Sequence, residues 1–144
     1  MKLIKVTTKH TQNEIDKIFN KINKYHLEIL ENLYSKFNYV EYINEDNYVS
    51  MFCVIDDNIM NKLRDSYINL SVNFKFEDLT KDALLCNKIK TNFLEDGVDV
   101  SEMITDLINS FYLDNITVDD ILDKISVKGV KSINDVDKLL LESI

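Results

Sequence analysis

Apolar residues recur along the first third of the chain at steps of three and four, the spacing of one face of an α-helix. The run follows Thr11 and Glu14, a Thr-x-x-Glu pair typical of a helix N-terminus. The pattern predicts one helix of about 26 residues, about 39 Å long. Such a helix is not stable alone, so we expect it to lie against a sheet. The predicted stripe consists of Ile15, Ile18, Phe19, Ile22, Tyr25, Ile29, Leu30, Leu33 and Phe37.

Four segments have the β-branched or alternating pattern of strands. The second and third flank the turn-forming residues 44–47 and predict a hairpin. Between the third and the fourth, residues 58–70 predict a second helix, with Asp56 or Asp57 as its N-cap. The four predicted strands are residues 2–7, 38–43, 48–55 and 71–77.

The order strand, helix, strand, strand, helix, strand is that of the ferredoxin-like split β-α-β repeat. The sequence therefore predicts an α+β protein with a ferredoxin-like β-α-β-β-α-β sandwich over residues 1–92. Residues 79–93 fit either a helix or an additional edge strand. Because no Pro- or Ser-rich linker follows, we expect residues 93–144 to pack on this core.

The pattern of residues 93–144 changes to three short helices, a small acidic C-terminal helical subdomain. Each predicted helix opens on a capping sequence, at residues 99–102, 117–120 and 132–135. Gly129 is expected just after the end of the second helix, where a residue without a Cβ is favoured.

The last two of these helices carry a recurring sequence pattern, in which an "ILDKIS" helix is followed by a glycine and a second helix. Residues 118–144 resemble a two-helix tail found at the C-termini of otherwise unrelated Bacteroidetes proteins, including some rhomboid-type proteases. Ile133 replaces the usual leucine of that tail, and Asp137 replaces the usual glutamate. The resemblance implies no known activity, and residues 1–117 resemble no family that we know. The matching positions are Ile121, Leu122, Asp123, Lys124, Ile125, Ser126, Gly129, Ser132, Lys138 and Leu141.

The charge of the chain is uneven. The 144 residues include 17 Lys and Arg against 25 Asp and Glu, a formal net charge of −8. Residues 1–90 are balanced, so the whole net charge lies in residues 91–144. Either these acids form a face that attracts a basic protein partner, or they only cap helices and solvate the surface. The candidate partner-binding residues are Asp106, Asp119, Asp120 and Asp123.

The chain has few residues suited to catalysis or to holding a cofactor. Its cysteines, Cys53 and Cys86, form no C-x-x-C pair, and we expect both to be reduced, buried, small apolar residues. A dyad of Cys53 with His26 has no support from spacing, and His10 is the only other histidine. The two glycines are isolated, so no nucleotide-binding loop is present. We predict no catalytic residue, no metal ligand and no cofactor.

Nucleic acid and membranes are poor candidates as partners. Tyr39, Tyr48 and Phe52 are the aromatic residues that a sheet could offer to RNA, but residues 1–90 carry no net positive charge and no RNP motif. No apolar run approaches the about 18 residues of a membrane span, and the first residues do not resemble a signal peptide. We therefore expect a cytoplasmic protein.

The sequence favours a non-enzymatic acidic protein-binding module: an adaptor, inhibitor or immunity-type protein. Its richness in Ile, Lys and Asn, which have AT-rich codons, fits an origin in a phage or mobile element. A structural subunit of a larger assembly, such as a virion, is the alternative, and a homo-oligomer fits the same residues. A small hydrolase with an atypical site is a second alternative.

Overall fold

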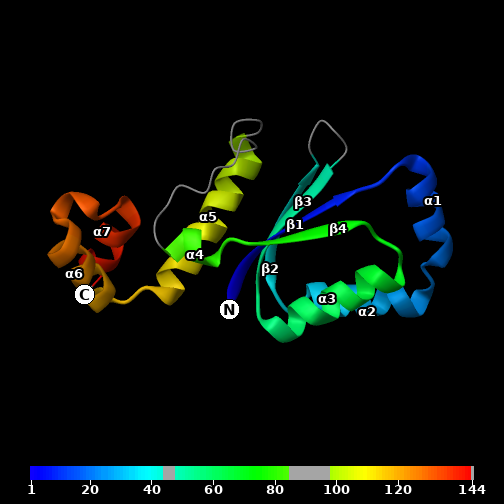
Figure 1. Ribbon diagram of the computed structural model, residues 1–144, viewed down its shortest axis with the longest axis horizontal. Coiled ribbons are helices and arrows are strands. Elements are labelled where there is room, and N and C mark those ends of the chain that lie inside the picture. Colours follow the sequence, from blue (N-terminus) through cyan, green and yellow to red (C-terminus); the bar gives the residue numbers. More distant parts are fainter. Residues whose placement is uncertain (44–47, 85–97, 144) are drawn as a thin grey trace.

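A four-stranded antiparallel sheet forms the centre of the molecule, with helices packed on both faces (Figure 1). The computed structural model describes residues 1–43, 48–84 and 98–143. The strands lie in the order β2-β3-β1-β4, and the predicted α+β class is confirmed. They are β1 (Lys2–Lys9), β2 (Asn38–Ile43), β3 (Tyr48–Ile55) and β4 (Phe74–Asp78).

The helices connect the strands and then continue beyond them. α1 and α2 join β1 to β2, α3 joins β3 to β4, and the remaining helices follow β4. Figure 1 shows α2 and α3 on one side of the sheet, α5 on the other, and α6 and α7 beyond the C-terminal end of α5. The helices are α1 (Gln12–Lys21), α2 (Lys24–Tyr34), α3 (Asp57–Asn69), α4 (Thr80–Leu84), α5 (Val98–Asn115), α6 (Val118–Lys128), the short 3₁₀ helix η2 (Val130–Ser132) and α7 (Asp135–Glu142).

One face of the sheet packs against α2 and α3. Ile4 and Val6 of β1 form a buried cluster there with Leu33 of α2 and Leu63 of α3. Successive strand residues point to opposite faces, so the alternation in β1 directs these two side chains to the same helices. Complete burial of an aliphatic side chain contributes about 1.5–3 kcal/mol, and this cluster fixes the two helices to the sheet.

β3 is buried on both faces. Met51 and Cys53 belong to the cluster under α2 and α3, whereas Phe52 between them packs with Val40 of β2 and Ile104 of α5. An almost continuous apolar run is typical of a strand that is covered on both sides. The run over residues 48–55 therefore reflects the position of α5 as well as that of α2 and α3.

The first predicted helix is two helices, so the prediction of one continuous helix to Phe37 is wrong. α1 ends at Lys21, Ile22 has an extended backbone with ψ 119°, and Asn23 is the N-cap of α2. The side-chain oxygen of Asn23 accepts a 3.0 Å hydrogen bond from the backbone N–H of His26. Such a cap stabilises a helix by about 1 kcal/mol and here competes with continuation of α1. Three members of the predicted stripe are exposed: Phe19, Tyr25 and Ile29.

The hairpin and the second helix agree with the prediction, whereas the last strand, predicted over residues 71–77, begins only at Phe74 and ends at Asp78. β2 and β3 pair on either side of residues 44–47, which lie outside the described residues, and Asp56 caps α3. Within the ambiguous residues 79–93, Thr80–Leu84 form α4, and residues 85–93 lie outside the described part of the chain.

Three helices follow at the C-terminal end, as predicted. Thr117 and Asp120 make the expected capping box of α6. Two predicted caps are wrong, because α5 already includes residues 99–102 and α7 is capped by Asn134 rather than by Ser132.

Contact between the sheet and the C-terminal helices is made by α5. Ile104 and Phe111 of this helix are buried, with Phe52 and Leu3 respectively in their clusters. The boundary predicted at residue 92 falls outside the described residues. Among the helices that the structure describes, none is both long and apolar enough to cross a membrane.

Candidate functional site

The four acids predicted to bind a partner are all exposed. Asp106 lies on α5, whereas Asp119, Asp120 and Asp123 lie in the first half of α6. The structure thus places three of them on one helix and the fourth on the helix before it.

The outer face of α6 combines acidic and apolar side chains. Four residues lie on this side of the helix, because each is three or four positions from another member of the set: Asp119, Leu122, Asp123 and Val127. The opposite side is anchored by Ile121, which is fully buried. Leu122 is 51% exposed and Val127 is 81% exposed. α6 therefore presents uncovered apolar side chains next to carboxylates.

Asp120 differs from its neighbours because it also caps α6. Its Oδ2 accepts hydrogen bonds from the backbone N–H and from the hydroxyl of Thr117, both at 2.8 Å. The backbone N–H, followed by the hydroxyl, holds the pKa of Asp120 below its ordinary value. No described residue donates a hydrogen bond to Oδ1, so one oxygen of this carboxylate remains open to a ligand.

A hollow of about 520 Å³ lies between the C-terminal end of α5 and α6. Asp120 and Asp123 line it, and so does the exposed Val127. Residues from three helices meet here, so the spacing of residues within one helix could not predict the hollow. The other lining residues are Leu84, Tyr112, Asn115, Ile116, Lys124 and Lys128.

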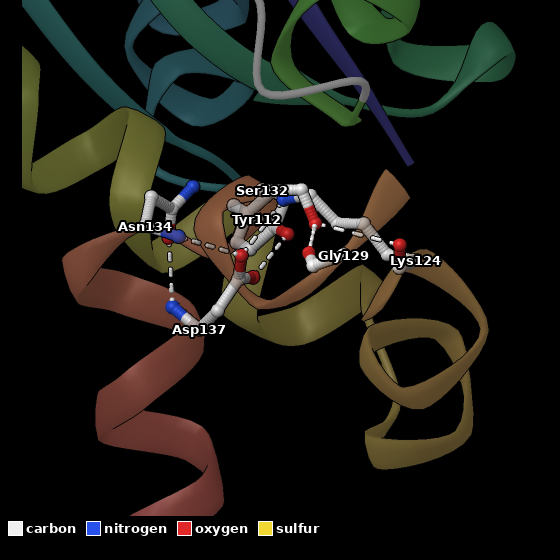
Figure 2. A network of polar contacts seen from close by, with 6 residues as sticks. All are labelled: Tyr112, Lys124, Gly129, Ser132, Asn134 and Asp137. Carbon is white, nitrogen blue, oxygen red and sulfur yellow. Dashed lines mark hydrogen bonds and ion pairs between the residues drawn. The ribbon is translucent and has the colours of Figure 1, made fainter. Parts of the chain in front are cut away.

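A buried carboxylate, that of Asp137, joins the three C-terminal helices (Figure 2). Its Oδ1 accepts a hydrogen bond from the hydroxyl of Tyr112 on α5, and its Oδ2 accepts one of 2.8 Å from the ammonium of Lys124 on α6. Oδ2 also accepts a 3.0 Å bond from the backbone N–H of Asn134, whose side chain caps α7 in return. Both oxygens of this fully buried side chain are therefore satisfied.

The surroundings of Asp137 keep it ionised. Burial alone would raise its pKa, but hydrogen bonds from Lys124, Tyr112 and the backbone of Asn134 outweigh burial and hold the pKa below the ordinary value of 3.8. Removing one partner of a buried ion pair leaves an uncompensated charge and costs about 3–5 kcal/mol. The ion pair and the hydrogen bond from Tyr112 together fix the relative positions of α5, α6 and α7.

The role of Asp137 is not visible in the apolar pattern of the sequence. The signal that identifies it is the capping box Asn134-x-x-Asp137, two residues after the predicted one. Ser132 instead belongs to the turn before α7, where its hydroxyl donates a 2.6 Å bond to the carbonyl of Gly129 (Figure 2). Gly129 has φ 83°, a conformation that favours glycine, as predicted for this helix end.

Cys53 is a buried, small apolar residue, as expected. Its thiol donates a 3.5 Å hydrogen bond to the carbonyl of Ile4, and burial raises its pKa to about 12. Since the thiolate is the nucleophilic form, this thiol is a poor nucleophile near neutral pH. No hydrogen bond joins Cys53 to His26 within the described residues. Cys86 lies outside them.

The other ionisable side chains do not gather into a recognisable metal site. His10 accepts a 2.8 Å hydrogen bond from the backbone N–H of Asn73 and so links the end of β1 to the segment before β4. Across the three described stretches of the chain, no group of three or more His, Cys, Asp or Glu residues is placed to hold a metal ion.

The three aromatic residues considered for RNA do not share an open face. Tyr39 pairs with Cys53 in the sheet, on the side of α2 and α3, whereas Phe52 points to the opposite side and is fully buried. The ring of Tyr48 lies under the ammonium of Lys9, 4.5 Å from the ring centre. These three side chains therefore do not form an exposed row of rings on which bases could stack.

No family model matches the chain, and comparisons with curated proteins and with solved structures give no match either. The most distinctive groups of the described residues lie in the C-terminal helices: the exposed carboxylates of α6 and the buried carboxylate of Asp137.

Proposed function

We propose that this protein is a non-enzymatic protein-binding module whose acidic C-terminal helices contact a basic surface of a partner protein. The observation that carries this proposal is the outer face of α6, where Asp119 and Asp123 lie beside the exposed Leu122 and Val127. Carboxylates guide a basic partner to the surface, and apolar side chains gain free energy when the partner covers them. An adaptor, an inhibitor or an immunity-type protein would act in this way.

The distribution of charge supports the proposal. The front of the chain is electrically balanced, and the net charge of −8 belongs to residues 91–144. Asp106, Asp119 and Asp123 form no ion pair with any described residue, so nothing described neutralises them locally. A concentration of one sign of charge on one part of a protein accelerates encounter with an oppositely charged partner.

The fold that we propose for the front of the chain is a ferredoxin-like sandwich. Two features support it: the order of strands and helical connections up to β4, and the strand order β2-β3-β1-β4 with antiparallel neighbours. α5 then covers part of the sheet face that such a sandwich leaves open. In the same way, α6, Gly129 and α7 have the helix, glycine, helix order of the tail that residues 118–144 resemble.

Affinity capture from the source cells, read out by mass spectrometry, tests the proposed function. We expect a basic protein that is retained at about 0.1 M salt and released at about 1 M, because the Debye length falls from about 10 Å to about 3 Å. The triple variant Asp106→Asn, Asp119→Asn, Asp123→Asn should lose this protein even at the lower salt concentration.

A control variant separates the effect of the acidic C-terminal helices on binding from the effect of the total charge of the protein. Glu28→Gln, Glu31→Gln and Asp65→Asn change three exposed acids of α2 and α3 and give the same net charge. This control should retain the partner. Equal loss in both variants, or retention by both, would contradict the proposal.

The alternative, a subunit of a larger assembly, is favoured by a different surface. Phe19 of α1 is 68% exposed, and Tyr25 and Ile29 of α2 are 69% and 39% exposed. Exposed apolar side chains of this size mark contact sites where they form a patch. Light scattering of the pure protein distinguishes the two functions, since a stable, salt-insensitive oligomer without another partner supports the assembly and a monomer supports the binding module.

A further inference from the structure

We propose that the hollow between α5 and α6 binds an arginine side chain of the basic partner, an inference that rests on the proposed function. Its volume of about 520 Å³ lies within the range of about 300–1,000 Å³ in which proteins enclose ligands. The hollow therefore has room for an arginine together with an apolar residue beside it.

The lining matches the two parts of an arginine side chain. Leu84, Ile116 and Val127 offer apolar contacts to its aliphatic stem. Asp120 and Asp123 stand one turn apart on α6, about 5–6 Å between their Cβ atoms for this spacing. A guanidinium has five donors in a planar fork, so it can bond two carboxylates at such a separation.

The charges around the hollow leave room for one cation. Lys124 also lines the hollow, but its ammonium is paired with the buried carboxylate of Asp137 at 2.8 Å. Lys128 also lines the hollow and brings one positive charge, against the two negative charges of Asp120 and Asp123. One negative charge is left over, and the single charge of an arginine balances it.

The carboxylates are also free to accept the new hydrogen bonds. Oδ1 of Asp120 has no donor among the described residues, because both bonds from Thr117 go to Oδ2. Asp123 has no hydrogen bond to a described residue and is exposed. Binding would therefore not require any capping bond of α6 to break.

Two helical peptides of leucine and alanine test this inference, one with a single central arginine and one with citrulline, its neutral isostere, in the same place. Titration is followed by NMR at the methyl groups of Ile116 and Val127. We expect the arginine peptide to shift these signals and the citrulline peptide to bind at least about tenfold more weakly, because loss of charge from a partly desolvated pair has an effect of this size.

Two protein variants compare neighbouring carboxylates of α6. Asp123→Asn should weaken binding of the arginine peptide about tenfold. Asp119 lies on the same helix but does not line the hollow, so Asp119→Asn should weaken binding only about twofold, as is typical of an exposed charge. Their thermal melting curves establish that both variants are folded.

Equal binding of the two peptides, equal effects of the two variants, or no binding of the arginine peptide would overturn the inference. These results differ from failure of the proposed function. If the triple acidic variant loses a salt-sensitive partner while the peptides show no preference, the acidic face is the binding surface and the hollow is not. If no basic partner is captured but the arginine peptide binds with the expected preference, the hollow recognises arginine and the proposed function is wrong.

Discussion

Replacing Asp137 by asparagine removes one charge from the centre of the C-terminal helices and keeps the size of the side chain. In the wild type its two oxygens accept bonds from Tyr112, Lys124 and the backbone of Asn134. In the variant one oxygen becomes an NH₂ group that meets these donors, and the Lys124 ammonium loses its counter-charge. The side chain of Lys124 is 19% exposed, so water screens part of that charge. We expect a loss of about 3 kcal/mol, at the low end for a broken buried pair.

Urea unfolding followed by circular dichroism measures this loss. The matched control is Asp135→Asn, two residues earlier on α7, whose side chain is 99% exposed and lies 3.7 Å from Lys138. The control should barely move the unfolding midpoint. Adding Lys124→Met to Asp137→Asn should restore part of the lost stability, because it removes the ammonium that has lost its counter-charge. Equal destabilisation by Asp137→Asn and Asp135→Asn, or simple additivity with Lys124→Met, would refute this account of the network.

Three further predictions follow from other parts of the structure. The pKa of Asp137 is lower in the folded protein than its ordinary 3.8, so its ionised form contributes to the free energy of unfolding above about pH 4. That contribution is lost as the pH falls below this value. The stability of Asp137→Asn should therefore fall less steeply with acid than that of the wild type. Ser71 has φ 58° at the end of α3, so Ser71→Gly should raise the free energy of unfolding by about 0.5–1 kcal/mol in urea titration, and a decrease would contradict the strain. In a Cys86→Ser variant the thiol of Cys53, with a pKa of about 12, should react with a thiol reagent only as fast as the protein unfolds, and rapid labelling of the native protein would show that it is accessible.

The sequence was sufficient to predict most of the elements in the front of the chain. Their strands and helices are specified by local signals, such as the alternation in β4 and the cap at Asp56. The break between α1 and α2 was not predicted, because Asn23 fits both a solvated position inside a helix and an N-cap, and the apolar spacing continues across it. Which apolar residues are buried depends on that bend, so the exposure of Phe19 and Tyr25 could not be anticipated.

The candidate site was predicted in part. Asp106, Asp119 and Asp123 are exposed acids, as expected from their positions in polar parts of helical patterns. The hollow was not predicted, because it forms only where α4, α5 and α6 meet. The ion pair of Asp137 was missed for the same reason, since Tyr112 and Lys124 lie 25 and 13 positions away along the chain.

The rate at which the captured partner associates, measured at increasing salt, tests the central claim most directly. The wild type should associate more slowly as salt rises, and the triple variant of Asp106, Asp119 and Asp123 should associate about tenfold more slowly at low salt with little further dependence on it. The control with the same net charge should follow the wild type. Identical rates for the wild type and the triple variant at low salt would show that the acidic C-terminal helices do not recruit the partner.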